Sequence, residues 1–219
     1  MSVLAIDTSE AWCSATLVAN GAALGSMREK LGRGHAERLM PMIEELMAEA
    51  GCSLGDVTRL AVVTGPGTFT GLRIGLSVAR GLGLALSKPV IGITGLSLVA
   101  GPVLERTGGT VHAVVDGRGG QAFHQAFEGF DSDGLPVPVS DAGCFDMDII
   151  REKIAARPGH VAGSGATPAG SADAAFDGID PVWLARVAER LDPAAFPPEP
   201  AYFRPPDAKK ATPLFPVAV

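Results

Sequence analysis

The sequence predicts an α/β protein of two lobes that arose by a degenerate internal duplication, the second lobe being the smaller. Two apolar strand patterns each end in an aspartate, Asp7 and Asp116, and each is followed by further strands before any helix. Strand and helix patterns then alternate, as in α/β folds. A chain of 219 residues can form two small domains. We place the first lobe at residues 1–100 and the second at residues 101–219.

Three strands are expected to open the first lobe. Residues 2–6 form a short apolar run, and Trp12–Ala19 alternates loosely between apolar and polar side chains. The Asn20-Gly21 pair is a strong hairpin signal, and a third strand is expected at Ala22–Glu29. Together these segments predict an antiparallel meander.

Helices and strands alternate through the rest of this lobe. Apolar side chains recur at helical spacing over His35–Ala50, and Gly51 is a suitable C-cap. The continuous apolar run Arg59–Gly65 is typical of a buried parallel strand. A helix over Leu72–Ser87 and a strand over Pro89–Ile93 are expected to complete the lobe.

The second lobe is expected to repeat this order. Its elements are strands at Val111–Gly117, at Gln121–Phe130 and near Val137, a helix at Asp146–Ala156, a strand at His160–Ala166, and a helix around Trp183–Leu191. The stretch from Pro181 onward holds nine of the 17 prolines, which argues there against regular helix or central strand and for a path along the surface.

Composition favours a globular cytosolic protein. With 47% hydrophobic and 19% charged residues, the chain is too apolar for disorder and too interrupted by charge for a membrane protein. The N-terminus shows no export signal. Three cysteines, far apart in the sequence, suggest neither a disulfide framework nor a zinc site. The net charge of −6 argues against independent binding to nucleic acid.

Two segments could bind phosphate in the first lobe. Asp7-Thr8-Ser9 follows a buried strand, where hydroxyls and backbone N–H groups can meet a phosphate, or the aspartate simply caps the turn. The loop Gly65–Gly71 joins a strand to a helix, a geometry that attracts anions. It lacks the Gly-Lys-Ser/Thr ending of a P-loop. In such loops a threonine, here Thr68 or Thr70, more often N-caps the following helix than binds phosphate.

In the second lobe, Asp116-Gly117-Arg118 is either a second phosphate-side aspartate with an anion-binding arginine or a charged turn. Asp7, Thr8, Ser9, Asp116 and Arg118 are therefore weak nucleotide-binding candidates. No cofactor is predicted, with ATP or ADP at a subunit interface as the alternative. No metal site is predicted either, because the four histidines show no ligand spacing. No serine or cysteine has the sequence setting of a catalytic nucleophile.

The second helix carries a row of small residues, Gly71, Gly75, Ala79 and Gly83. Each interior glycine costs about 1 kcal/mol relative to alanine, so close packing must offset the loss. The row either packs on the chain's own sheet or forms a docking face for another subunit. Together with Leu72, and with Leu39, Met42, Ile43 and Leu46 of the first helix, these residues are the partner-binding candidates.

The chain resembles one known family through five strings: IDTS (Ile6–Ser9), HAERLMPMIEEL (His35–Leu46), GPGTFTGLRIG (Gly65–Gly75), ARGLGLAL (Ala79–Leu86) and PAYFR (Pro200–Arg204). It is identified as similar to the TsaB family, also called YeaZ. The matches run from residue 6 to residue 204, and the third string is long and specific.

This resemblance implies an actin/Hsp70-like (ASKHA) fold and a cytosolic, non-catalytic dimerization subunit. It implies pairing with the catalytic paralogue TsaD and the ATPase TsaE, or with a second copy when alone. That complex transfers threonylcarbamoyl to the adenosine beside the anticodon of tRNAs that decode ANN codons, so tRNA would be met only through the complex. In the family, the two helices of the first lobe form the bundle with the partner.

Two departures from related proteins affect the interpretation. The paired-histidine metal motif of the paralogue has no counterpart here, and Asp116-Gly117-Arg118 and Gln121-Ala122-Phe123 replace the Asp-Ala-Arg and Glu-Val-Tyr of many relatives. The second departure weakens charged-ligand binding by that face. The competing functions are a stand-alone actin-like ATPase or small-molecule kinase and, with less support, a metallopeptidase.

Overall fold

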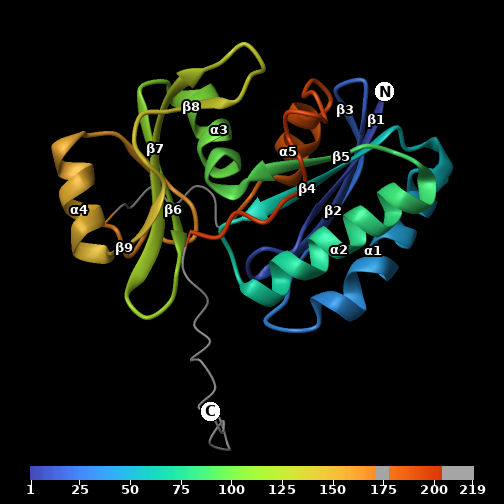
Figure 1. Cartoon of the computed structure of the whole chain (residues 1–219), viewed down its shortest axis with the longest axis horizontal. Coiled ribbons are helices and arrows are strands. Elements are labelled where there is room, and N and C mark those ends of the chain that lie inside the picture. Colours follow the sequence, from blue (N-terminus) through green and yellow to red (C-terminus); the bar gives the residue numbers. More distant parts are fainter. Residues whose placement is uncertain (171–177, 204–219) are drawn as a thin grey trace, which may run out of the picture.

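The computed structural model describes residues 1–170 and 178–203, which form two sheets with helices on both sides of each (Figure 1). The first sheet has the order β3-β2-β1-β4-β5. Strands β1 to β3 form the predicted antiparallel meander, and β4 and β5 run parallel to β1. The bounds are β1 Ser2–Asp7, β2 Trp12–Ala19, β3 Ala22–Lys30, β4 Arg59–Gly65 and β5 Val90–Thr94.

The second sheet repeats the pattern of the first in reduced form. Its order is β10-β6-β7-β8, with β9 paired to β7. Strand β6 pairs antiparallel with β7 and parallel with β10, as β1 does with β2 and β4. The sequence did not predict β9, and β10 is shorter than the expected strand. The bounds are β6 Thr110–Asp116, β7 Gln121–Phe130, β8 Pro136–Pro138, β9 Gly143–Asp146 and β10 His160–Ala162.

The helices separate and cover the two sheets in layers (Figure 1). Two helices pack on the outer face of the first sheet, two lie between the sheets, and one covers the second sheet. In that order they are α1 (His35–Glu49) and α2 (Phe69–Leu86), α3 (Gly95–Thr107) and α5 (Pro181–Ala188), and α4 (Met147–Ala156). A short 3₁₀ turn, η1 (Leu54–Asp56), precedes β4.

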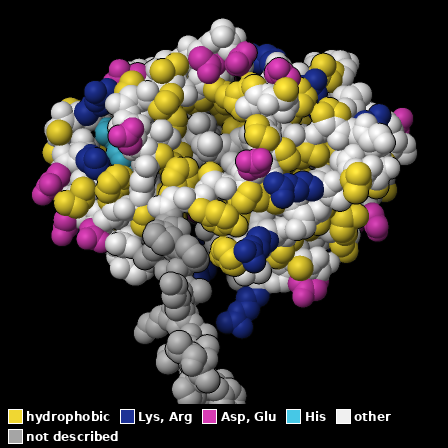
Figure 2. Space-filling view, in the orientation of Figure 1, with side chains coloured by type: hydrophobic (Ala, Val, Ile, Leu, Met, Phe, Trp, Pro, Cys, Tyr) yellow, Lys and Arg dark blue, Asp and Glu magenta, His cyan; other side chains and the backbone are white. Residues whose placement is uncertain are grey.

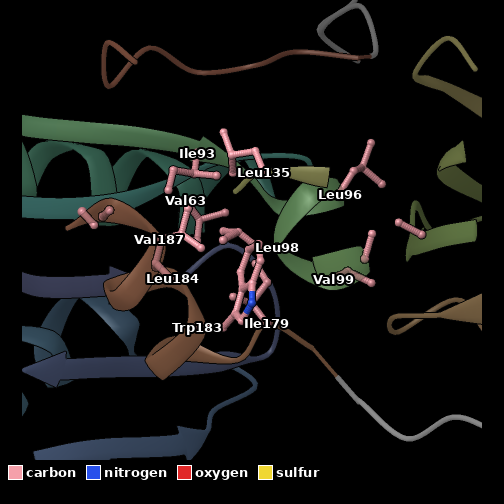
Figure 3. Close-up of a cluster of buried hydrophobic side chains, with 14 of the residues drawn as sticks. Val63, Ile93, Leu96, Leu98, Val99, Leu135, Ile179, Trp183, Leu184 and Val187 are labelled. Carbon is pink, nitrogen blue, oxygen red and sulfur yellow. The ribbon is translucent and has the colours of Figure 1, made fainter. Parts of the chain in front are cut away.

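The side chains of β1 alternate between the two faces of the first sheet and so contribute to two separate hydrophobic clusters. Val3 and Ala5 point into the cluster between the sheets, and Leu4 and Ile6 point into the cluster under α1 and α2. Side chains of a strand face opposite sides in turn, so one strand supplies both cores. Figure 3 shows the central cluster, to which both interior helices contribute. Each buried aliphatic side chain contributes roughly 1.5–3 kcal/mol of hydrophobic stabilisation.

Helix α3 is absent from the sequence prediction, which assigned no element between β5 and β6. Residues on all of its sides are buried, and Pro102 lies inside it. A helix that is hydrophobic all round has no amphipathic period to detect. Gly101 allows the Trp183 ring to approach, because a Cβ there would lie 2.1 Å from Trp183 Cζ2.

Helix α5 confirms the predicted helix around Trp183–Leu191 and corrects the expectation of irregular structure from Pro181 onward. Pro181 occupies the first turn, where a missing N–H does no harm, and Asp180 Oδ1 accepts hydrogen bonds from the backbone N–H groups of Val182 and Trp183. The helix packs on β1 and β2, so the second half of the chain contributes to the first lobe. Residues 192–203 follow without regular structure, and Arg204 lies outside the described residues.

Candidate functional site

The loop Gly65–Gly71 closes against the end of β1. Helix α2 begins at Phe69, earlier than predicted, because the Thr68 hydroxyl accepts a hydrogen bond from Gly71 N at 3.1 Å and caps the helix. Thr68 N donates to the Ser9 carbonyl at 2.7 Å. The N-cap interpretation of this loop is therefore confirmed for Thr68.

Asp7, Thr8 and Ser9 lie buried beneath this loop. The Thr8 hydroxyl donates to the Gly71 carbonyl at 2.7 Å, and Ser9 N donates to Asp7 Oδ1 at 2.8 Å. Burial raises the pKa of the Asp7 carboxyl. These residues thus hold the end of β1 against α2.

Asp116 lies exposed at the end of β6 in the second lobe. Its Oδ1 accepts from Arg118 N at 2.9 Å, and Asp116 N donates to Ser164 Oγ at 3.0 Å. The segment is a charged turn, one of the two predicted interpretations. Nucleotide binding at Asp7, Thr8, Ser9, Asp116 and Arg118 stays a prediction.

The small-residue row of α2 packs on the chain's own sheet, which was one of the two predicted alternatives; the other, a docking face at these residues, is wrong. A Cβ on Gly71 would lie 2.1 Å from the Thr8 carbonyl oxygen, and one on Gly75 would lie 2.7 Å from Thr8 Oγ1. At Gly83 the nearest atom would be Val90 Cγ2, at 2.4 Å. Ala79 is buried as well. The glycines therefore allow α2 to approach β1, β4 and β5.

The other partner-binding candidates are also core residues. Leu72 of α2 is buried, and the α1 side chains Leu39, Met42, Ile43 and Leu46 are fully buried in the cluster under the two helices. None of them is open to a partner in this structure. They hold α1 and α2 on the sheet and so determine which side chains these helices expose.

A second row of side chains on α2 leaves apolar surface accessible. Each of its residues directly precedes one of the small residues in the sequence. Ile74, Val78 and Leu82 are half-buried and recur every four residues. A shallow groove runs along this row, lined by Ala36, Phe69, Thr70, Arg73, Ile74, Ser77 and Val78. Leu84, in the last turn, is 85% exposed. The sequence already shows this four-residue spacing, but the docking face was predicted at the row of glycines instead.

Charge differs between the two helices beside this groove. Exposed acidic side chains lie on α1, at Glu37, Glu44 and Glu49, whereas Arg73 and Arg80 are exposed on α2. Figure 2 shows basic and hydrophobic side chains side by side over the part of the surface where α2 lies. The face thus combines an apolar row with separated opposite charges.

Helix α2 is also the one helix in the described part of the chain that is long and apolar enough to cross a membrane. The core helix of a soluble protein passes the same test. Here the buried side of α2 packs on β4.

Two histidines that are far apart in the sequence meet beneath α4. His112 Nδ1 and His124 Nε2 lie 2.9 Å apart, and His112 Nε2 lies 2.7 Å from the Arg157 carbonyl oxygen. Burial lowers the pKa of both, that of His124 to about 4. The antiparallel pairing of β6 with β7 creates this contact, which sequence spacing could not indicate. Among residues 1–170 and 178–203, no group of three side chains has a metal-ligating arrangement.

Comparison with known proteins shows which families the chain is similar to. The family model of TsaD, tRNA N6-adenosine threonylcarbamoyltransferase, matches residues 23–135. The tRNA threonylcarbamoyladenosine biosynthesis protein TsaB of Escherichia coli is 33% identical over 155 residues, and that of Haemophilus influenzae is 38% identical over 119 residues. These matches cover 70% and 54% of this chain but only 66% and 50% of the relatives.

A solved structure, YeaZ from Pseudomonas aeruginosa, superimposes with a TM-score of 0.73 at 27% identity, covering 92% of this chain and 99% of that one. The two related lobes and this likeness define an actin/Hsp70-like (ASKHA) fold. Within that class, the chain belongs to the TsaB (YeaZ) family.

Proposed function

We propose that this chain is a non-catalytic dimerization and scaffold subunit that docks on a TsaD-type catalytic paralogue through α1 and α2. The assembly would install threonylcarbamoyl on the adenosine beside the anticodon of tRNAs that read ANN codons. The observation that carries the proposal is the accessible apolar row Ile74, Val78 and Leu82 on a family member whose TsaD-matching region, residues 23–135, includes both helices.

Charge supports a partner that carries a similar helix pair. If two such pairs associate about a pseudo-two-fold axis, the acidic α1 of one meets the basic α2 of the other. Opposite potentials across an interface favour correct pairing and fast association. A second copy of this chain offers the same pattern, so we also propose a homodimer when the paralogue is absent.

The remaining parts of the proposal follow the family. They comprise a cytoplasmic location, a TsaE-type ATPase as the third protein, and tRNA bound only through the assembly, in keeping with a net charge of −6. No cofactor is assigned to this chain alone, and ATP or ADP would belong to the subunit interface.

Co-elution of the full chain with its TsaD-type paralogue tests the docking face. Val78→Arg adds a charge to the middle of the apolar row, and we expect it to abolish co-elution and the stimulation of threonylcarbamoyl transfer. Ile149→Arg on α4 is the matched control, because Ile149 is a helical residue, 42% exposed, on the opposite side of the molecule. Stoichiometric co-elution of a folded Val78→Arg variant would show that the row is not the docking face.

A further inference from the structure

The described C-terminal segment, residues 195–203, crosses the first lobe as a strap. Gly92 N of the edge strand β5 donates to the Phe196 carbonyl at 2.9 Å, and Ala201 N donates to the Thr64 carbonyl of β4 at 2.8 Å. Gly92 has no room for a side chain, because a Cβ would lie 2.6 Å from the Pro197 carbonyl oxygen. The strap is therefore held in register by backbone contacts.

The strap also reaches α2 and the second lobe. The Arg80 guanidinium donates to the Pro198 carbonyl. The ring of Phe203 lies 6.2 Å from that of Phe123 on β7 and joins the central core. With Phe203 anchored inward, the neighbouring Tyr202 points to the surface.

Tyr202 and Phe69 form an exposed aromatic pair at the start of α2. Their ring centroids are 6.0 Å apart, and Tyr202 is 53% and Phe69 49% exposed. The Arg73 guanidinium lies 3.7 Å from the Phe69 ring centroid. Phe69 and Arg73 also line the groove that contains Ile74 and Val78. The aromatic pair is thus continuous with the accessible row of α2.

We infer that the strap forms one end of the docking face, and that the paralogue covers Phe69 and Tyr202 when it packs on α1 and α2. This inference rests on the proposed function and extends its surface to Tyr202, which lies outside the two helices. Exposed aromatic and arginine side chains are the types that dominate binding energy once a partner desolvates them. The strap holds Tyr202 in place and helix α2 holds Phe69 in place before association, which reduces the entropy lost on binding.

Titration calorimetry of the full chain with the paralogue tests the inference. We expect Tyr202→Ala and Phe69→Ala each to weaken binding by at least about tenfold, while Tyr202→Phe, which keeps the ring, binds like the original chain. Phe130→Ala is the matched control, since Phe130 is 39% exposed on β7 of the second sheet. Thermal unfolding of each isolated variant checks that the fold is intact.

The outcomes separate the inference from the proposed function. If Tyr202→Ala and Phe69→Ala bind within about twofold of the original chain while Val78→Arg does not bind, the helix face stands and the strap inference is overturned. If Val78→Arg also binds normally, the docking face itself is wrong. Equal loss of affinity in Tyr202→Ala and Tyr202→Phe would also overturn the inference, because the ring would then not be the contact.

Discussion

The buried histidine pair makes the stability of the second lobe sensitive to acid. The Arg157 carbonyl can only accept, so His112 Nε2 must carry a hydrogen, and neutral His112 then presents a bare Nδ1. His124 Nε2–H donates to that atom. His124 Nδ1 is left as a buried lone pair without a partner in the described part of the chain. A proton added there would have no acceptor and would lie near the positive charge of Lys153.

The size of the effect follows from the pKa of His124, which burial lowers from 6.5 to about 4. Because the unfolded chain binds a proton below pH 6.5 and the folded chain does not, the free energy of unfolding falls as the pH drops from 6.5 towards 4. One unit of pKa corresponds to about 1.4 kcal/mol. At pH 5 the protonation of His124 in the unfolded chain alone lowers the free energy of unfolding by about 2 kcal/mol. Most Asp and Glu side chains with unshifted pKa values are still ionised at this pH and add little to the change.

Chemical denaturation at pH 7 and pH 5 measures this loss. We expect the difference in unfolding free energy between the two pH values to shrink by about 2 kcal/mol in His124→Gln, which has no titrating group. His160→Gln is the matched control, since His160 is exposed at the start of β10. An unchanged difference in His124→Gln, or an equal change in His160→Gln, would refute the assignment of the acid sensitivity to this pair.

Four further substitutions test other parts of the fold. Gly75→Ala should destabilise the chain by about 1–3 kcal/mol, because the new Cβ would meet Thr8 Oγ1 at 2.7 Å; Gly81→Ala, on the open side of the same helix, should instead stabilise it by up to about 1 kcal/mol in thermal or urea unfolding. Trp183→Ala should cost about 3–5 kcal/mol in the same assay, since its ring is buried between the sheets. Arg38→Met should raise the pKa of the Glu29 carboxyl, which hydrogen bonds from Arg38 now lower, and NMR titration reads this shift directly.

Local patterns in the sequence were sufficient for most elements that have one polar and one apolar side. The meander of β1 to β3 follows from alternation and from Asn20-Gly21, and α1 follows from its helical period. Helix α3 was missed because it is buried on all sides between the two sheets. Strand β9 was missed because its four residues pair with β7 across a long loop, a contact that no local pattern encodes.

The candidate docking face shows a different limit of sequence reasoning. Spacing identified which residues of α2 share a side, but it could not tell what covers that side. Two rows with a four-residue period lie one position apart, Gly71 to Gly83 and Ile74 to Leu82. Only the positions of Thr8, Val62 and Val90 decide that the first row is covered by the chain's own sheet. The contact of Tyr202 with Phe69, far apart in sequence, required the fold.

The two rows on α2 depend on each other. Because Gly71 and Gly75 have no side chains, the helix axis can approach β1 until Thr8 donates to the Gly71 carbonyl. A larger residue at either glycine would push the helix outward or rotate it about its axis, and rotation by one position is about 100° in an α-helix. Such a rotation would carry Val78 away from the groove. The role of the small row is thus mechanical: it fixes the depth and rotation of α2, and that rotation places the apolar row where a partner can reach it.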